Sequence, residues 1–158
     1  MNQKKRLEFL VDNVKKITKI QNFGVYMNKL LTIDALFLNE DRHTHNIAVL
    51  MNDKQEYKLC PIFDNGAGLL SDIMIDYSLD GDIYEEIGSV NAKTISLSFD
   101  EALHASEVLY GMNFEPRFSK DDVMKILYSK DVNIYSEKIR EKVERILFEQ
   151  MRKYNYLF

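Results

Sequence analysis

The chain has 158 residues, of which 46% are hydrophobic and 29% charged, and its formal net charge is −4. This composition predicts a single globular domain, residues 1–158, and the negative charge argues against direct nucleic-acid binding, which needs a basic face. No apolar run reaches the roughly 20 residues of a membrane span, no signal-peptide core is present, and the single cysteine cannot form an internal disulfide. We therefore expect a cytoplasmic protein with no membrane contact.

Two helices are predicted in the first 40 residues. In the first, apolar side chains recur at steps of three or four residues, which indicates one apolar stripe: Leu7, Leu10, Val14 and Ile17. Gly24 is expected to end that pattern. Residues 25–38 predict a second helix with little polar face, which should be buried centrally.

A β-hairpin is predicted next. Two short apolar runs, residues 47–50 and 57–63, flank the turn-forming pair Asn52 and Asp53. Residues 70–92 have weak periodicity, so we expect a long ordered loop with one helical turn near Tyr84.

Two further helices are predicted toward the C-terminus. Ser119 can cap a helix at residues 120–129, and a last helix with one apolar face is expected at residues 136–153. The predicted fold class is mainly α with a small antiparallel β-hairpin.

Three residues around the hairpin point to chemistry: Asp41, Asn46 and Asp64. If Leu50 pairs with Cys60, then Asn46 lies opposite Asp64, with Cβ atoms roughly 4.5 to 5.5 Å apart. A carboxylate and an amide oxygen at this spacing can share one Mg²⁺ ion that water and phosphate oxygens complete. Asp41 would then lie beside the metal and orient or deprotonate a hydroxyl nucleophile, as phosphoryl transfer requires.

The same residues carry a family resemblance, which covers roughly residues 36–70. Residues 39–47, which read NEDRHTHNI, resemble the catalytic loop of the HipA-like kinases, and their DRHxxNI core also resembles that of the phosphoinositide 3-kinase group. Residues 61–66, which read PIFDNG, resemble the HipA-like counterpart of the Asp-Phe-Gly motif of protein kinases. The resemblance implies a protein-kinase-like C-terminal lobe that uses ATP and Mg²⁺ and phosphorylates a protein substrate on serine or threonine.

The resemblance also implies roles for single residues. Asp41 matches the catalytic aspartate, Asn46 the metal-binding asparagine, and Asp64 the aspartate that binds the metal of the nucleotide. His43 matches a loop histidine that takes part in the reaction in some relatives and holds the loop in others. Arg42 is expected to brace the loop or to pair with a carboxylate.

Each part of the motif also has a plain structural explanation. Asp64-Asn65-Gly66 alone is a common turn signal, so the prediction depends on the three features together. Zinc binding by His43 and His45 lacks a third ligand. Residues 59–92 contain seven carboxylates and no Lys or Arg, which predicts either a solvated acidic face or a surface that attracts a basic peptide substrate.

The N-terminal lobe of a kinase has no counterpart in the sequence. Only 40 residues precede Asp41, and they contain neither a glycine-rich loop nor a Val-Ala-x-Lys strand. Three functions therefore stay open: a kinase C-lobe, an interaction module or split-kinase subunit that binds a separate N-lobe or an antitoxin-like protein, and a small-molecule phosphotransferase. Members of the last class usually have a histidine where this chain has Asn39.

Overall fold

The computed structural model describes residues 2–158, which form a mainly helical fold with one two-stranded antiparallel sheet. The predicted mainly α class with a small β-hairpin is confirmed, and the kinase-like C-terminal lobe stays a prediction. The α-helices are α1 (Gln3–Thr18), α2 (Phe23–Phe37), α3 (Ile83–Ser89), α4 (Phe99–Tyr110), α5 (Lys120–Leu127) and α6 (Glu137–Lys153). The strands are β1 (Val49–Met51) and β2 (Tyr57–Leu59), and the short 3₁₀ helices are η1 (Thr44–Asn46), η2 (Lys130–Val132) and η3 (Asn155–Leu157). Within residues 2–158, no helix combines the length and the apolar character that a bilayer crossing needs.

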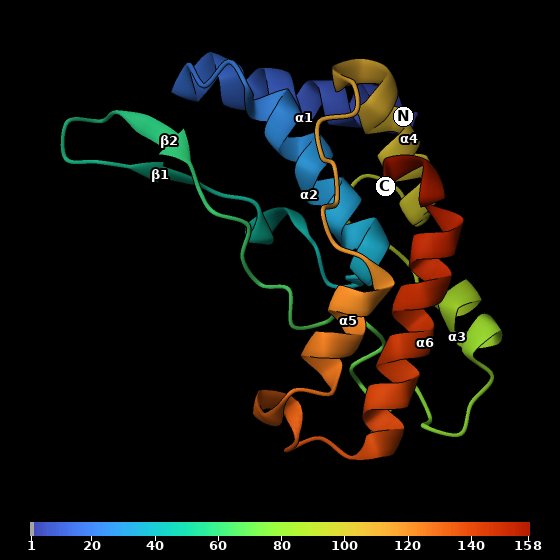
Figure 1. Ribbon diagram of the computed structural model, residues 1–158. Coiled ribbons are helices and arrows are strands. Elements are labelled where there is room, and N and C mark those ends of the chain that lie inside the picture. Colours follow the sequence, from blue (N-terminus) through green and yellow to red (C-terminus); the bar gives the residue numbers. More distant parts are fainter. Residues whose placement is uncertain (1) are drawn as a thin grey trace.

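Helix α2 is the central element and packs against α1, α4 and α6 (Figure 1). Its first turns place Phe23, Met27 and Leu30 in a core that includes residues of α1. Its last turn places Ala35 and Leu36 in a second core, which includes residues of α4 and α6. The prediction of a centrally buried second helix is therefore confirmed. A helix with apolar side chains on most of its faces is most stable when other elements cover those faces.

Gly24 lies inside α2, so the predicted break at this residue is wrong. The chain instead leaves α1 at Lys19, which has a φ of 64°. A Cβ atom on Gly24 would lie 2.5 Å from the ring of Tyr110 at the end of α4. Glycine is therefore present because two helices approach closely at this point and not because the chain turns there.

The apolar stripe of α1 also differs from the prediction at one residue. Ile17 is 68% exposed, whereas Val11 and Thr18 are buried with Leu7. At 3.6 residues per turn, Thr18 falls almost directly in line with Leu7, and Ile17 is rotated away from that line. The contacts with α2 and α4 therefore follow a different line of residues from the one that apolar spacing alone suggests.

The hairpin has a different register from the predicted one. Leu50 lies opposite Lys58, so the predicted pairing of Leu50 with Cys60 is wrong. The Gln55 N–H donates to the Asn52 carbonyl at 2.9 Å, and Gln55 has a φ of 60°, which closes a three-residue loop. Glutamine seldom adopts this left-handed conformation, so the sequence gives little sign of it.

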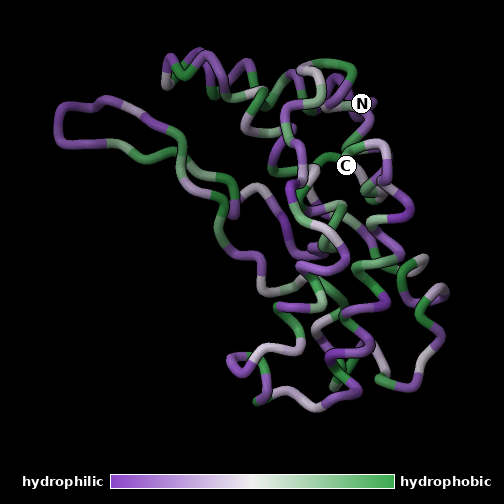
Figure 2. Tube along the Cα trace, in the orientation of Figure 1, coloured by the Kyte–Doolittle hydropathy of each residue, from purple (hydrophilic) through white to green (hydrophobic). Residues whose placement is uncertain are grey.

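The corrected register also removes the predicted cross-strand pair of Asn46 and Asp64. The strands are only three residues long, and Asn46 lies in η1, before β1 begins. The hairpin projects away from the helical body (Figure 1), with a hydrophilic tip and a more hydrophobic base (Figure 2). At the base, Val49, Tyr57 and Leu59 pack against the core that α1 and α2 share.

Helices α3, α5 and α6 agree with the predictions in place and differ in length, whereas α4 was not among the predicted helices. Helix α3 contains Tyr84 in the otherwise irregular acidic segment, where one helical turn was expected. Ser119 caps α5 in a reciprocal capping box with Asp122, and α5 ends two residues before the predicted bound. Ser136 caps α6 through the backbone N–H of Ile139.

Candidate active site

The loop with the kinase-like motif begins where α2 ends. Leu38 adopts a φ of 51°, which ends the helix, and the Asn39 N–H then donates to the Asp34 carbonyl at 3.0 Å. The Asn39 side chain is 2% exposed, and its Nδ2 donates to the Asp34 carboxylate at 3.1 Å. The first residue of the motif is thereby fixed to the last turn of α2.

Arg42 is the residue that holds the loop together. Its guanidinium pairs with the Asp34 carboxylate, with 3.1 Å between Nε and Oδ2, and the two side chains are only 1% and 3% exposed. Burial raises the pKa of the Asp34 carboxyl above its ordinary value, although hydrogen bonds and charge from Arg42 act in the opposite direction. The prediction that Arg42 braces the loop by pairing with a carboxylate is confirmed.

The five N–H donors of Arg42 all have acceptors, and these join two parts of the predicted site. Nη1 donates to the Asn46 carbonyl at 3.2 Å and also to the carbonyl of Phe63, and Nη2 donates to the Asp34 carboxylate at 3.2 Å and to the side-chain oxygen of Asn65. Because one nitrogen contacts both carbonyls, Asn46 lies beside the residue that precedes Asp64. The structure thus brings Asn46 and the Asp64 segment together, through a buried guanidinium and not through strand pairing.

Asp41 and Asn46 are held together on the other side of the loop. The Asn46 Nδ2 donates to the Asp41 carbonyl at 3.1 Å, which leaves the side-chain oxygen of Asn46 available for another partner. The Asp41 carboxylate itself is 49% exposed, and its one ion pair within residues 2–158 is with Lys93, at 3.4 Å. The backbone of Asp41 is therefore fixed while its carboxylate stays accessible.

Asp64 is exposed and adopts a φ of 57°, a left-handed conformation that aspartate tolerates better than most residues. Its carbonyl accepts a hydrogen bond from the Asn39 Nδ2 at 3.4 Å, so Asn39 links the start of the loop to Asp64. Within residues 2–158, no three His, Cys, Asp or Glu side chains gather as a metal site would require. Asn46 and Asp64 stay the predicted protein ligands of a cation, which would need further oxygens from a bound molecule or water.

Gly68, and not Gly66, is the glycine whose position is sterically restricted after Asp64. A Cβ atom on Gly68 would lie 3.0 Å from the Phe37 carbonyl, whereas one on Gly66 would meet nothing within 4 Å. The Phe37 carbonyl also accepts from the Leu69 N–H at 2.7 Å. This contact places the segment after Asp64 against the end of α2.

His43 is half-buried and its role stays a prediction. Its Nδ1 is buried without a hydrogen-bond partner in the described part of the chain, and its ring lies edge-on to that of His45 with 5.4 Å between centroids. The Asn39 Oδ1 is a second buried polar atom of the loop without a partner among residues 2–158. Buried polar atoms of this kind normally have protein, water or ligand partners.

Four contributors to this site were not identified from the sequence. Asp34 is a carboxylate in the mostly apolar helix α2. A buried carboxylate needs a cationic partner, and this requirement could have pointed to Arg42. Thr94 donates to the Arg42 carbonyl at 2.5 Å, and Tyr77 donates to Glu40 at 2.8 Å. Lys93, Thr94 and Tyr77 are distant in the sequence and share no local pattern with the loop, so only the fold could reveal them.

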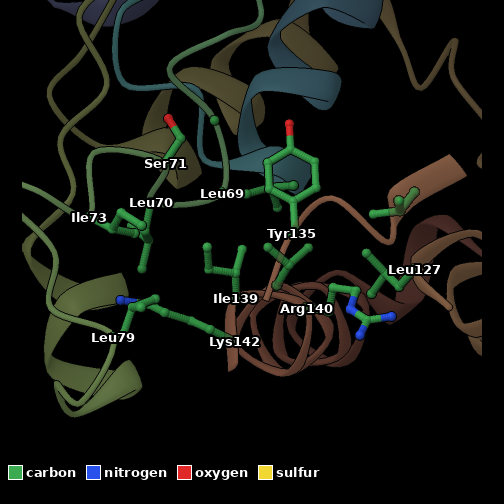
Figure 3. Close-up of a pocket in the computed structure, with 13 residues that line it drawn as sticks. Leu69, Leu70, Ser71, Ile73, Leu79, Leu127, Tyr135, Ile139, Arg140 and Lys142 are labelled. Carbon is green, nitrogen blue, oxygen red and sulfur yellow. The ribbon is translucent and has the colours of Figure 1, made fainter. Parts of the chain in front are cut away.

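A cavity of about 310 Å³ lies elsewhere, between the segment after Asp64 and α6 (Figure 3). Its walls are mostly apolar, with Leu70, Ile73 and Ile139 among them, and Lys142 crosses one side. The Lys142 ammonium contacts Glu86 and the Ser78 carbonyl, 2.6 and 2.7 Å away. Because Asp41, Asn46 and Asp64 do not line this cavity, we do not connect it with phosphoryl transfer.

No known protein family matches the sequence, and neither curated proteins nor solved structures include a match to it. The kinase-like assignment therefore depends on the motif residues and on their arrangement.

Proposed function

We propose that this chain is the C-terminal lobe of an ATP- and Mg²⁺-dependent phosphotransferase of the HipA-like serine/threonine kinase type. The observation that carries the proposal is the contact of one Arg42 nitrogen with the carbonyls of both Asn46 and Phe63. This contact brings the backbone of Asn46 close to the backbone of Phe63, the residue before the exposed Asp64, and this proximity supports shared binding of one divalent ion.

The proposed ligands fit Mg²⁺. This ion is commonly bound through one or two protein oxygens, with water and substrate phosphates completing its octahedral shell. Asp64 is exposed. In Asn46 the amide nitrogen donates to the Asp41 carbonyl, and the side-chain oxygen stays available for a metal ion. When bound, the ion would neutralise charge on the phosphates of ATP.

The other residues have proposed roles in placing the reacting groups. The accessible Asp41 carboxylate would accept a hydrogen bond from the substrate hydroxyl and orient it, or remove its proton. His43, two residues on, is the second proposed catalytic residue; it is half-buried, and a neutral imidazole can both donate and accept a hydrogen bond. Arg42 and Asp34 would act only by holding the loop, because neither is exposed.

Calorimetric titration of the purified chain with Mg²⁺ and ATP tests the proposal. Asp64→Asn removes the charge and keeps a residue that tolerates the left-handed backbone, so it should weaken Mg-ATP binding by at least roughly tenfold. Asp76→Asn, in the same acidic segment and also exposed, is the matched control and should bind like the wild type. A wild-type chain that binds no Mg-ATP, or equal affinity in both variants, contradicts a self-sufficient nucleotide site.

A second function is supported by exposed apolar side chains near the site. Leu50, Met51 and Phe63 are all exposed, and the hairpin that carries the first two projects from the body (Figure 1). An isolated two-stranded hairpin is only marginally stable in water, so a covering partner would stabilise it. That partner would be a separate N-lobe or an antitoxin-like protein, and Mg-ATP binding that arises only when a kinase N-lobe is added would favour this split arrangement.

A further inference from the structure

Phosphoryl transfer needs a cation near the transferred group, because negative charge must be neutralised where the γ-phosphoryl oxygens lie. In a kinase with two lobes, a lysine of the N-lobe holds phosphates of the nucleotide, and this chain has no counterpart of that strand. Any phosphate-binding cation that the C-lobe itself supplies must therefore come from the residues around Asp41.

Arg42 is next to Asp41 in the sequence but cannot have this role. Its side chain is 1% exposed, and all of its donors are engaged by protein acceptors. The chain from residue 59 to residue 92, which includes Asp64, contains no Lys or Arg. The motif and the segment after it thus provide no free cation for a phosphate.

Lys93 is the first cation after this stretch, and the fold returns it to the site. Its Nζ lies 3.4 Å from the Asp41 Oδ1, although the two residues are 52 positions apart. The residues on both sides fix its backbone, because Ala92 is 5% exposed and Thr94 is 6% exposed and donates to the Arg42 carbonyl. The Lys93 side chain is nevertheless 53% exposed, so its ammonium can contact a bound molecule.

We propose that Lys93 binds the γ-phosphoryl group of ATP and that its contact with Asp41 keeps the ammonium in place when no nucleotide is bound. This inference rests on the proposed kinase function and adds a residue that the motif does not contain. A lysine ammonium is a compact point charge with three donors, which suits a phosphate whose position changes during transfer. Because the contact is with the third phosphate, Lys93 should distinguish ATP from ADP.

The test compares the affinities of Mg-ATP and Mg-ADP by calorimetry for the wild type, Lys93→Met and Lys93→Arg. We expect Lys93→Met to weaken Mg-ATP binding by roughly tenfold and to leave Mg-ADP binding unchanged, since a charge-assisted hydrogen bond to the third phosphate is lost. Lys93→Arg should retain most of the preference for ATP. Lys138→Met is the matched control, because Lys138 is 50% exposed and also forms a surface ion pair, with Asp80.

The outcomes separate this inference from the function on which it rests. A wild-type chain that binds neither nucleotide overturns both the self-sufficient nucleotide site and the role of Lys93 in it. If the wild type binds Mg-ATP and Asp64→Asn weakens it, but Lys93→Met changes ATP and ADP affinity equally or not at all, the role of Lys93 is wrong and the kinase site stands. If Lys138→Met weakens Mg-ATP binding as much as Lys93→Met does, the role of Lys93 is also wrong, because the weaker binding would then reflect the lower net charge.

Discussion

Asp34 and Arg42 form a buried ion pair in which Nε lies 3.1 Å from Oδ2, and this pair joins the last turn of α2 to the centre of the candidate loop. Removing one partner of such a pair leaves the other charge buried and uncompensated. The pair therefore controls both the stability of the fold and the position of Asn46 relative to Asp64.

Asp34→Ala should lower the free energy of unfolding by about 3–5 kcal/mol, because Arg42 would lose its charged acceptor inside the protein. Urea unfolding followed by circular dichroism measures this change. Asp80→Ala, which removes an 80%-exposed carboxylate from a surface ion pair, should show no measurable change. Equal stability of the two variants would mean that Arg42 is not buried as described.

The two glycines of α2 and α3 should respond to alanine in opposite directions. Gly24→Ala should lower the free energy of unfolding by roughly 1–2 kcal/mol, because the new methyl group would overlap the Tyr110 ring. Gly88→Ala, in α3, meets nothing within 4 Å and should raise it by up to about 1 kcal/mol through helix propensity. Thermal and urea unfolding of both variants test the contrast, and stabilisation by Gly24→Ala would exclude the close helix contact.

Tyr110 should make the fold sensitive to alkaline pH. Burial, together with the negative charges of Asp12 and Glu8, raises the pKa of Tyr110 from 10.0 to about 12. As the pH rises through this window the unfolded chain loses the Tyr110 proton first, so the folded state loses stability between pH 10 and about 12. Below pH 10 the contribution of Tyr110 is complete.

Tyr110→Phe tests this directly, because phenylalanine cannot ionise. Its free energy of unfolding should fall less steeply than that of the wild type over the same pH window, as measured by urea unfolding at a series of pH values. The difference between the tyrosinate absorbance titrations of the two proteins should report a group that ionises late. A difference titration centred at the ordinary tyrosine pKa would show that Tyr110 is not buried.

Asp41→Asn should separate binding from transfer. The substitution removes the negative charge beside Lys93, where the phosphates of ATP are proposed to bind, so Mg-ATP affinity should stay equal or increase. Loss of the proposed orienting base should lower the rate of phosphoryl transfer by about 10²-fold or more. Calorimetry and transfer of labelled phosphate, with Asp76→Asn as control, distinguish the two effects, and a lost affinity for Mg-ATP would instead make Asp41 a nucleotide ligand.

Local signals in the sequence were sufficient for most of the helices. Ser119 and Ser136 mark helix starts because their side chains satisfy backbone N–H groups that the helix leaves free. The prediction at Gly24 was wrong because glycine occurs both at chain turns and at close helix contacts. Only the neighbouring Tyr110 shows that Gly24 belongs to a close helix contact. The hairpin register was wrong because it depends on the left-handed conformation of Gln55, which side-chain type does not predict.

The sequence by itself predicted Asp41, Asn46 and Asp64 as the candidate site and a bracing role for Arg42, because both predictions follow from residue type and spacing in one short segment. Only the tertiary structure decided how they meet. The buried Asp34 carboxylate and the Arg42 guanidinium hold the loop, and Lys93 reaches Asp41 from 52 positions away. Such contacts depend on how α2 and the segment before α4 pack, and packing between distant segments leaves no periodic pattern in the sequence.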